Sequence, residues 1–386
     1  MRILHVIGTL SIKHGGTYTA LMSIMQMFDR LGYENELITT IDSLNSNADY
    51  DKNYFQSRLI VFNKSFPARF KKSVTALKWL NQNIANYNVV IVHEIWTGIG
   101  LDACKVAYDK NITYHIWPHG SLDPFDLKKK KLLKKLVGFV LLNKILCKAK
   151  YICCTSQLEQ ELLEYFGKKN NNSIVLPLPV DYVTNIDLIK NIPVQFRNKY
   201  QIPKDTFVFL FLSRINYKKG LDIIIESLNE LLIEKLLPVD QVKLVIAGDE
   251  ATEYATHIKN LVTKYNLQNN VLFVGMLSGI NKIVAFKESN VFLLPSKNEN
   301  FGLAIVESLQ VGLPIIISKN IYIYKNLFNS EKPGWMCGEG TVDEVKSAMQ
   351  DAFYNMDNNI MKNSALQVGR QFMTEYLLSK YRVIFE

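Results

Sequence analysis

The sequence predicts an α/β protein with two doubly wound domains, each built around a parallel β-sheet. The chain has 386 residues, which is long for one domain and gives each of two domains enough residues to bury a core. Short runs rich in Val and Ile alternate with longer segments of helical periodicity, the pattern of βαβ units whose strands are covered on both faces. This alternation stops at a proline-containing stretch near residue 180 and then begins again.

The first domain is predicted to extend over residues 1–178. Its strands are expected at the apolar runs Ile3–Ile7, Glu36–Thr39, Val89–His93, Thr113–Trp117, Tyr151–Thr155 and Ser173–Leu176. The segment LPLPVDYVTNIDLIKNIPVQ then brings closely spaced prolines without periodicity, which predicts a linker. The domain boundary is therefore expected near Pro177–Asp181.

The second domain is predicted to extend over residues 179–369, and a C-terminal helix at residues 370–386 could pack back on the first domain. The expected strands and two of the helices between them are Phe207–Leu212, Lys243–Ala247, Val271–Val274, Val291–Leu294, Pro314–Ile317, Leu221–Leu232 and Tyr254–Tyr265. Two doubly wound domains that face one another leave a cleft at the carboxyl ends of their strands. Ligands bind at that place in such folds, so the chemistry is expected there.

Composition and charge narrow the class of protein. Apolar residues make up 48% of the chain and charged residues 21%, as in a globular protein with a core. The net charge of +9 favours acidic partners, which include nucleotide phosphates, nucleic acid and an anionic membrane surface. Charge alone does not choose among them.

The cysteines and the hydrophobic runs predict a cytoplasmic protein. The five cysteines are scattered and lack metal-ligand spacing, so we expect reduced thiols in the core. The start of the chain, MRILHVIGTL, does not resemble a signal peptide. No run reaches the roughly 18 apolar residues that a membrane-spanning helix needs.

A pair of acids marks the end of one strand of the second domain. The strand VFLLP leads into the loop SKNENFG, which contains Glu299, and a helix that contains Glu307 is expected to begin near Leu303. The unpaired N–H groups of a helix start bind phosphate or sugar oxygens, and Gly302 allows a close approach to a ligand. A carboxylate accepts two hydrogen bonds from a vicinal diol such as that of a ribose. The structural alternative is a solvated loop and a helix-surface acid.

A pair of cations follows the first strand of the same domain. In FLFLSRINYKKGLDIII, Arg214 comes just past the strand and Lys219 five residues later, before an amphipathic helix. Two cations at the edge of a sheet would neutralise a diphosphate leaving group. Solvated loop charges are the structural alternative.

Together these motifs resemble the retaining glycosyltransferases of family 4, which have the GT-B fold and include enzymes of bacterial polysaccharide, O-antigen and capsule synthesis. The resemblance rests on Glu-x7-Glu with Phe-Gly after the first acid, on a following Gly-x-Pro, and on the Arg-x4-Lys element. It covers most of the chain and is strongest over residues 209–314. It implies two Rossmann-like domains and transfer of a hexose-type sugar from a nucleoside diphosphate sugar.

The resemblance also implies roles for individual residues. Glu307 would bind the ribose, Glu299 would lie beside the donor sugar, and Arg214 and Lys219 would neutralise the diphosphate. Further residues expected to contact the donor, through backbone or side chain, are Gly302, Leu303, Ala304, Gly15, Gly16, Gly248, Met276 and Leu277. For Gly15 and Gly16 a plain turn is an equal alternative.

Trp117-Pro-His119-Gly120 resembles a Pro-His-Gly segment of the bacterial members of the family. His119 would hydrogen-bond the donor sugar or the reacting centre through a neutral imidazole, and a structural histidine is the equal alternative. By position alone, His93-Glu94 is a further candidate to face the acceptor. The segment from Thr155 to Glu159 is better explained as a helix N-terminus.

No metal and no cofactor are expected beyond the nucleotide sugar substrate. Many glycosyltransferases hold their diphosphate with a metal at an Asp-x-Asp site, and we expect Arg214, Lys219 and a helix dipole to replace it. The family implies retention of anomeric configuration. Because the leaving phosphate could accept the proton of the acceptor, no residue is assigned as general base.

Residues 126–150 form a basic segment in which lysines alternate with apolar residues at helical spacing. A helix of this kind can lie on an anionic bilayer, or it can pack on a sheet with a solvated lysine face. The first alternative would bring the enzyme to the inner face of the cell membrane and suggest a polyprenyl-linked acceptor. Too few aromatic residues accompany the lysines to suggest nucleic-acid binding.

Two other classes of function remain open beside a transferase that acts on a saccharide or lipid-linked saccharide in cell-surface polysaccharide biosynthesis. One is a nucleotide-sugar epimerase of the same fold, and the other is a non-catalytic protein that binds polyanions. The intact pairs of acids and cations argue against the second. One departure from the family pattern is Pro177-Leu-Pro-Val-Asp181 in place of Pro-Asn-Gly-Val-Asp, which predicts a stiffer linker.

Overall fold

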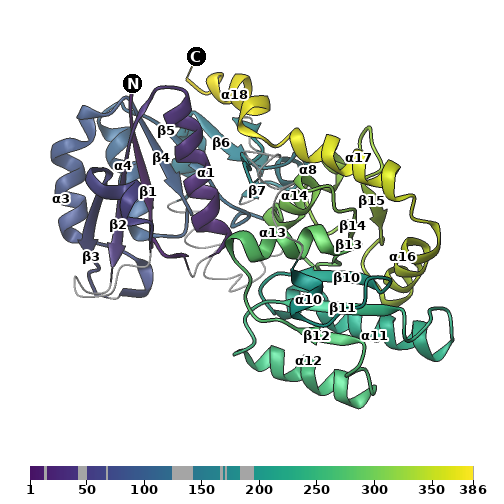
Figure 1. The fold of residues 1–386 in the computed structure, drawn as a ribbon. Coiled ribbons are helices and arrows are strands. Elements are labelled where there is room, and N and C mark those ends of the chain that lie inside the picture. The colour runs from purple at the N-terminus through teal and green to yellow at the C-terminus, as the bar shows by residue number, and fades with distance from the viewer. Residues whose placement is uncertain are drawn as a thin grey trace. The chain divides into compact units, whose positions relative to one another are not determined.

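The computed structural model describes residues 1–12, 15–41, 50–66, 68–123, 142–165, 168–169, 172–182 and 195–385. The chain divides into two compact units, here called unit 1 and unit 2 (Figure 1). Unit 1 comprises Met1–Pro179 and Leu377–Glu386, and unit 2 comprises Val180–Tyr376. Each unit contains one large parallel sheet.

Unit 1 is built on a seven-stranded sheet in the order β3-β2-β1-β4-β5-β6-β9. Its strands are β1 (Arg2–Ile7), β2 (Glu34–Ile41), β3 (Leu59–Asn63), β4 (Val89–His93), β5 (Thr113–Trp117), β6 (Tyr151–Cys154), β9 (Ser173–Val175) and the separate pair β7 (Glu164–Tyr165) and β8 (Lys168–Lys169). Its helices are α1 (Gly16–Arg30), α2 (Lys52–Phe55), α3 (Val74–Asn83), α4 (Gly98–Asp109), α7 (Asn143–Lys148) and α8 (Gln157–Glu161), with short 3₁₀ turns at Gln56–Arg58, Ala68–Phe70 and Ile84–Asn86.

The two faces of this sheet are buried by different helices. Leu4 and Val6 of β1 pack with residues of α3 and α4, whereas Ile7 packs with residues of α1. The alternation follows from the pleat of a strand, which turns successive side chains to opposite faces. His5 therefore lies on the α1 face, where its ring is 5.9 Å from that of Phe28.

Unit 2 is built on a six-stranded sheet in the order β12-β11-β10-β13-β14-β15. Its strands are β10 (Phe207–Leu212), β11 (Val242–Ala247), β12 (Val271–Phe273), β13 (Val291–Leu294), β14 (Ile315–Ile317) and β15 (Gly334–Met336). Its helices are α10 (Phe196–Lys199), α11 (Leu221–Ile233), α12 (Glu253–Lys264), α13 (Gly279–Glu288), α14 (Leu303–Gln310), α15 (Tyr324–Leu327), α16 (Val342–Asn355) and α17 (Asn358–Arg370), and a 3₁₀ turn covers Tyr217–Lys219. The last helix, α18 (Thr374–Arg382), begins in unit 2 and continues into unit 1. The predicted strands and the two helices predicted between them in unit 2 are confirmed within one or two residues, whereas the helix predicted at residues 370–386 is shorter, Thr374–Arg382.

Both sheets are doubly wound, because the strand order runs outward in both directions from a central pair. In unit 1 the order reverses between β1 and β4, and in unit 2 it reverses between β10 and β13. Ligands of doubly wound sheets bind outside the carboxyl ends of the strands at this reversal, the topological switch point. Ligand binding is therefore expected at the loops that follow these four strands.

The chain passes between the units at Pro179–Val180 and again at Tyr376–Leu377. On the unit 2 side, the Val180 N–H donates to the Phe372 carbonyl (2.8 Å). On the unit 1 side, the Tyr381 hydroxyl donates to the Pro177 carbonyl (3.0 Å), and its ring contacts Phe28 at 5.8 Å. The end of α18 and the residues after it thus complete the α1 face of the first sheet.

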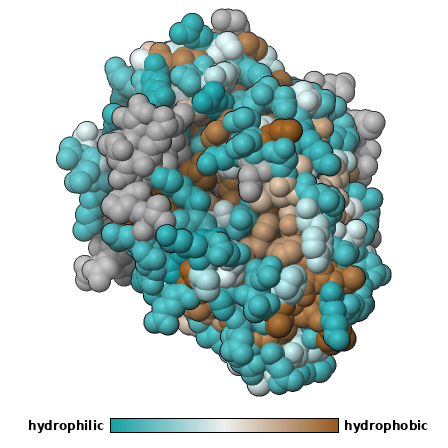
Figure 2. All heavy atoms as spheres, turned by 45° about the vertical axis from the view of Figure 1, so that its right-hand side comes forward, coloured by the Kyte–Doolittle hydropathy of each residue, from teal (hydrophilic) through white to brown (hydrophobic). Residues whose placement is uncertain are grey.

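The surface is mostly hydrophilic on the face drawn in Figure 2, with apolar side chains in smaller areas. Within the described residues, no helix is long and apolar enough to span a membrane. None of the five cysteines, all of which the structure describes, forms a disulfide; four are buried and Cys147 is exposed. Most of the basic segment 126–150 lies outside the described residues, and its last helical part is α7.

Candidate functional sites at the switch point of each sheet

The two charged motifs of unit 2 meet at its switch point. Arg214 follows β10 after one intervening residue, and Glu299 lies in the loop after β13, the neighbouring strand. The loops are joined by a hydrogen bond from the Lys297 N–H to the Lys218 carbonyl (2.7 Å). Elements separated by about 80 residues of sequence thereby form one surface.

Gly220 allows these loops to approach one another. It is the N-cap of α11 with φ 70°, and a Cβ atom there would lie 2.3 Å from the Pro295 carbonyl oxygen at the end of β13. No side chain fits in that space, and the left-handed backbone also favours glycine. Packing therefore requires glycine at position 220, next to Lys219.

Lys219 is the cation at the centre of this surface. Its ammonium group contacts the Glu299 carboxylate, and the two side chains are only 12% and 19% exposed. Burial lowers the pKa of Lys219 to about 7, with Arg214 and Lys218 adding to the shift, whereas the contact with Glu299 opposes it. Arg214 is exposed. The ligand-free site thus pairs one cation with an acid and leaves the other cation open to solvent.

Glu307 is paired with a lysine that the sequence motifs did not indicate. It lies in the second turn of α14, and its carboxylate contacts the Lys282 ammonium group of α13 at 2.5 Å. Both side chains are largely buried, at 10% and 18% exposure. The Lys282 ammonium also lies 5.2 Å from the Tyr182 ring centre. Such a pair holds the Glu307 carboxylate in one position before any ligand arrives.

The start of α14 presents backbone groups rather than side chains. Gly302 is its N-cap, with φ 77°, and provides no capping side chain. Leu303 and Ala304, the first two helical residues, are half-buried. Backbone N–H groups at an uncapped helix start are free to bind an anion, and the helix dipole favours it. This is the geometry expected for the segment from Gly302 to Ala304.

Gly248, at the end of β11, supports the neighbouring loop. A Cβ atom at this position would lie 2.4 Å from the Ser213 carbonyl oxygen and 2.8 Å from Ile215. Glycine is therefore needed so that β11 can lie against the segment that carries Arg214. This packing accounts for Gly248 without a direct contact to a ligand.

Met276 and Leu277 follow β12 and differ from each other in exposure. Met276 is 78% exposed, whereas Leu277 is half-buried. Leu277 lines a pocket of about 410 Å³ together with Phe196, Tyr200 and Ile280. Of the two, Leu277 is the residue that an aromatic base could contact through an apolar surface.

The switch point of unit 1 carries Gly15 and Gly16. Gly15, with φ 58°, is the N-cap of α1, and Gly16 is its first residue. A Cβ atom at either position would meet nothing within 4 Å among the described residues. Packing within the described part of the chain therefore does not require glycine at Gly16, which keeps both interpretations of this pair open.

His119 lies in the loop after β5, the next strand outward. Its φ of 50° is uncommon for a residue with a side chain, and Gly120 has φ 77°. The Gly120 N–H donates to the Glu159 carboxylate (3.0 Å), which also accepts from the Thr155 hydroxyl (2.9 Å). Ser156 caps α8, as predicted. A buried acid thus holds the turn that displays His119.

The structure contradicts the idea that His93 faces an acceptor. Its side chain is fully buried at the end of β4, and its Nδ1 is 3.0 Å from the His119 Nε2. The ring lies on the α1 face of the sheet, 6.1 Å from the ring of Trp117 on the neighbouring strand. His93 could therefore influence a ligand only through another residue. Glu94 forms an ion pair with Lys71 at 3.2 Å.

One Asp-x-Asp triplet occurs in the chain, at Asp49-Tyr50-Asp51. The Asp51 carboxylate accepts hydrogen bonds from the Asn53 and Tyr54 N–H groups and caps α2. Asp49 lies outside the described residues. Within the described part of the chain, no three His, Cys, Asp or Glu side chains are grouped as a metal site.

Three comparisons place this geometry among known proteins. Residues 194–366, which include both charged motifs, match the family model described as glycosyl transferases group 1. An uncharacterized glycosyltransferase of Methanocaldococcus jannaschii is 26% identical over 325 residues, 78% of this chain and 72% of that protein. The UDP-Gal:alpha-D-GlcNAc-diphosphoundecaprenol alpha-1,3-galactosyltransferase of Escherichia coli is 27% identical over 286 residues, 72% of this chain and 69% of that protein. The crystal structure of Anabaena Alr3699/HepE in complex with UDP and glucose has a TM-score of 0.76 at 18% identity and covers 100% of this chain and 99% of that one.

Proposed function

We propose that this chain, a glycosyltransferase with the GT-B fold, transfers a hexose-type sugar from a nucleoside diphosphate sugar to a saccharide acceptor with retention of configuration. The observation that carries the proposal is the meeting of two charged loops at the switch point of unit 2. One loop provides Arg214 and Lys219, and the other provides Glu299. Few reactions other than departure of a diphosphate need two cations and an uncapped helix start at one place.

Each group of the donor has a partner of suitable chemistry in unit 2. Arg214 and Lys219 are cations for the diphosphate, and the N–H groups at the start of α14 add partial positive charge. The Glu307 carboxylate, held by Lys282, is an acceptor for the two ribose hydroxyls. Glu299 contacts Lys219. In this proposal Glu299 lies beside the donor sugar while Lys219 lies beside the leaving group.

The reaction breaks the bond between the anomeric carbon and the diphosphate oxygen and forms a bond to the acceptor hydroxyl oxygen. Negative charge develops on the leaving phosphate, where fixed cations lower the barrier. The departing phosphate takes the proton of the acceptor hydroxyl, so no side chain has to act as general base. Attack on the face that the phosphate leaves gives retention.

We propose that no metal ion is required. In the proposed site Arg214 and Lys219 already balance the charge that a divalent cation would otherwise neutralise. The prediction is that saturating EDTA leaves the rate of transfer unchanged. A loss of activity that Mg²⁺ or Mn²⁺ restores would contradict it.

For the acceptor we propose a lipid-linked saccharide used in cell-surface polysaccharide biosynthesis. The Escherichia coli relative is named for a diphosphoundecaprenol-linked sugar acceptor. The net charge of +9 and the lysines of residues 126–150 suit an enzyme that works at the anionic cytoplasmic face of a membrane. Flotation with anionic liposomes, compared between the wild type and a variant with Lys128–Lys131 changed to Gln, tests this part by itself.

A panel of nucleoside diphosphate sugars, scored first by thermal shift and then by nucleoside diphosphate release with and without acceptor, tests the main proposal. We expect one donor to stabilise the protein and acceptor-dependent release of its nucleoside diphosphate. The anomeric proton coupling of the product, measured by NMR, reports retention. An epimerase would instead convert the donor to its epimer without acceptor, and a polyanion-binding protein would release nothing.

A further inference from the structure

A row of hydrogen-bonded polar side chains crosses the α1 face of the sheet in unit 1, which is largely apolar. The His5 Nδ1 lies 3.1 Å from the His93 Nε2, and the His93 Nδ1 lies 3.0 Å from the His119 Nε2. His5 and His93 are fully buried in β1 and β4. At its other end the row continues from the His5 Nε2 to the Asn35 Oδ1 at 3.0 Å. Buried polar groups in such a place need partners, and these residues supply one another.

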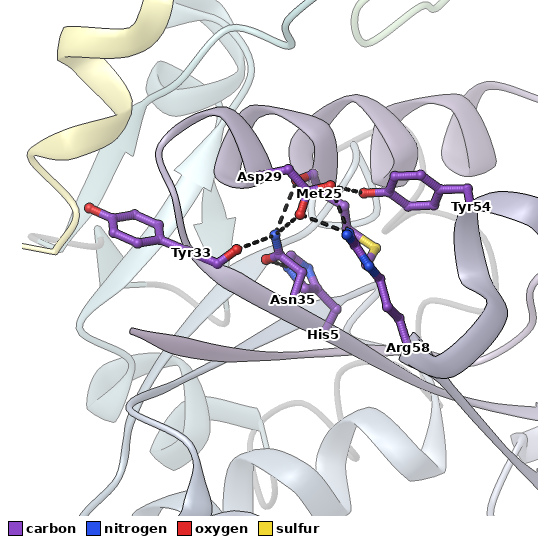
Figure 3. Close-up of polar contacts among 7 residues, drawn as sticks. All are labelled: His5, Met25, Asp29, Tyr33, Asn35, Tyr54 and Arg58. Atoms are coloured by element: carbon purple, nitrogen blue, oxygen red, sulfur yellow. Dashed lines mark hydrogen bonds and ion pairs between the residues drawn. The ribbon is translucent and has the colours of Figure 1, made fainter.

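The amide of Asn35 has its orientation set by what lies around it (Figure 3). Its Nδ2 donates to the Asp29 Oδ1 (2.9 Å) and to the Met25 carbonyl (3.2 Å), and the Tyr33 carbonyl lies at 3.4 Å. All three partners are acceptors, so the nitrogen must face them and the oxygen must face His5.

Asp29 is in turn held in place by two donors. The Arg58 Nη1 donates to both of its oxygens at 2.8 Å, and the Tyr54 hydroxyl donates to Oδ2 at 2.7 Å (Figure 3). Hydrogen bonds from a charged arginine are strong and fix the direction of the carboxylate. Asp29 therefore remains an acceptor for Asn35.

The fixed orientation of Asn35 determines which nitrogen of each histidine in the row donates its hydrogen. Burial lowers the pKa of His5 to about 4, that of His93 well below its ordinary value and that of His119 to about 4. A neutral imidazole has one N–H and one lone pair. Because the Asn35 oxygen can only accept, His5 carries its hydrogen on Nε2 and accepts on Nδ1. His93 must then donate from Nε2 and accept on Nδ1, and His119 must donate from Nε2.

We propose that Asn35 and Asp29 are positioning residues which, through His5 and His93, hold His119 in the tautomer whose Nδ1 lone pair accepts a hydrogen bond from a sugar hydroxyl. The assignment of a sugar as the partner rests on the proposed function. The tautomer itself follows from the geometry of unit 1. An uncharged acceptor suits a hydroxyl, whereas it offers no attraction to an anionic phosphate.

The surroundings of His119 support this role. Its Nδ1 has no hydrogen-bond partner among the described residues, although Nε2 is engaged with His93. His119 has a left-handed backbone conformation. This conformation costs free energy in any residue other than glycine and persists only where neighbouring groups enforce it. The Glu159 carboxylate provides that constraint through the Gly120 N–H.

The first test is independent of catalysis. In ¹⁵N-histidine-labelled full-length protein without substrate, long-range ¹H–¹⁵N spectra report which nitrogen of each ring carries hydrogen. We expect His5, His93 and His119 all to be neutral Nε2–H tautomers at pH 7, with assignments made from single substitutions. A hydrogen on the His119 Nδ1 in the wild-type protein would overturn the proposal, whether or not transfer is ever detected.

A matched pair of variants tests the effect on the reaction. His5→Phe breaks the row, whereas His115→Phe replaces another fully buried histidine of the same sheet, on β5. Neither ring nitrogen of His115 has a hydrogen-bond partner among the described residues, and its ring stacks on Tyr151 at 5.5 Å. We expect His5→Phe to lower kcat/KM roughly tenfold through loss of one oriented hydrogen bond, with little change for His115→Phe.

Asn35→Leu provides a second break if His5→Phe does not fold. It removes the acceptor at the fixed end, so His119 should show a mixture of the two tautomers and a similar fall in kcat/KM. Equal activity losses in His5→Phe, Asn35→Leu and His115→Phe would mean that the row has only a structural role. If no donor is turned over at all, the proposed function fails while the NMR result still decides the tautomer.

Discussion

The two sheets share one topology, but their switch points carry opposite kinds of polar chemistry. In unit 2 the groups are ionic, with Lys219 in contact with Glu299 and Lys282 in contact with Glu307. In unit 1 the buried groups are uncharged imidazoles joined to an amide, with one half-buried ion pair, Lys71–Glu94, after β4. The same scaffold thus presents charge at one switch point and oriented neutral hydrogen bonds at the other.

The difference teaches how one fold divides the demands of a transfer reaction. Charge stabilises a diphosphate, whose negative charge grows as the bond breaks. A sugar hydroxyl gains little from a net charge but much from a partner in the correct tautomer. If this division holds, changes in unit 2 should affect the departure of the leaving group, and changes in unit 1 should have smaller effects.

The largest effect is expected from the cations of unit 2. Arg214→Ala or Lys219→Ala should lower kcat by about 100- to 1000-fold, the usual cost of removing a group that stabilises transition-state charge. Lys297→Ala is the matched control, because this lysine lies on the neighbouring loop, is 40% exposed and pairs with Asp222. Steady-state kinetics with circular dichroism as a check of folding measures this, and unchanged turnover in both variants would refute the diphosphate assignment.

The loss in Lys219→Ala has a second source, because the substitution leaves the Glu299 carboxylate without its ammonium partner. The double variant Lys219→Ala/Glu299→Gln separates the two sources. If it recovers most of the activity, the unpaired acid caused the defect and Lys219 serves mainly to balance Glu299. We expect it to recover less than a tenth of the wild-type rate.

A smaller effect is expected at Glu307, the proposed partner of the ribose. Glu307→Gln keeps the shape but removes the charge, and we expect the KM for the donor to rise about tenfold or more with a smaller change in kcat. Lys282→Met should raise the same KM less, because Lys282 acts only through Glu307. A larger effect of Lys282→Met than of Glu307→Gln would show that the lysine itself binds the donor.

The sequence predicted the strands well because of where they lie. Strands buried on both faces are continuous apolar runs, such as β4 and β10. Runs of this length favour a strand, because a buried helix would be longer. The two strands of the large sheets that were missed, β3 and β15, are at sheet edges. β3 is only partly buried and β15 is a short strand that begins with glycine, so neither shows the apolar run.

The charged site was predictable in part. Arg214, Lys219, Glu299 and Glu307 lie in motifs with fixed spacing, whereas Lys282 lies on α13 and meets Glu307 only through tertiary packing. The row of histidines was not predicted, although the sequence contains a sign of it. His5 interrupts the run Ile3–Ile7, whose other residues are apolar, and a polar side chain in a doubly covered strand requires a partner elsewhere.

The dependence of the rate on pH also tests the comparison. The proposed site of unit 2 needs a charged Lys219, whereas the histidine row of unit 1 is neutral. Burial lowers the pKa of Lys219 to about 7, so its charge is present below that pH and is lost above it. The kcat/KM for the donor should therefore fall as pH rises past about 7, by at most tenfold per pH unit. In Lys219→Arg, whose side chain stays charged, this alkaline fall should disappear. An unchanged profile in that variant would assign the fall to another group.

The smallest effect is expected in unit 1, at the two ends of α1. Gly16→Ala places a methyl group in open space at the first residue of the helix, so the free energy of unfolding should rise by about 0.5 kcal/mol. Gly32→Ala, beyond the other end of the same helix, should lower it by about 1 kcal/mol, because Gly32 has φ 78°. Urea unfolding measures both. If the donor phosphates pass close to Gly16, Gly16→Ala should also raise the donor KM severalfold despite its greater stability, whereas Gly32→Ala should leave KM unchanged. A stabilised Gly16→Ala variant with the wild-type KM would assign this glycine pair to a plain turn.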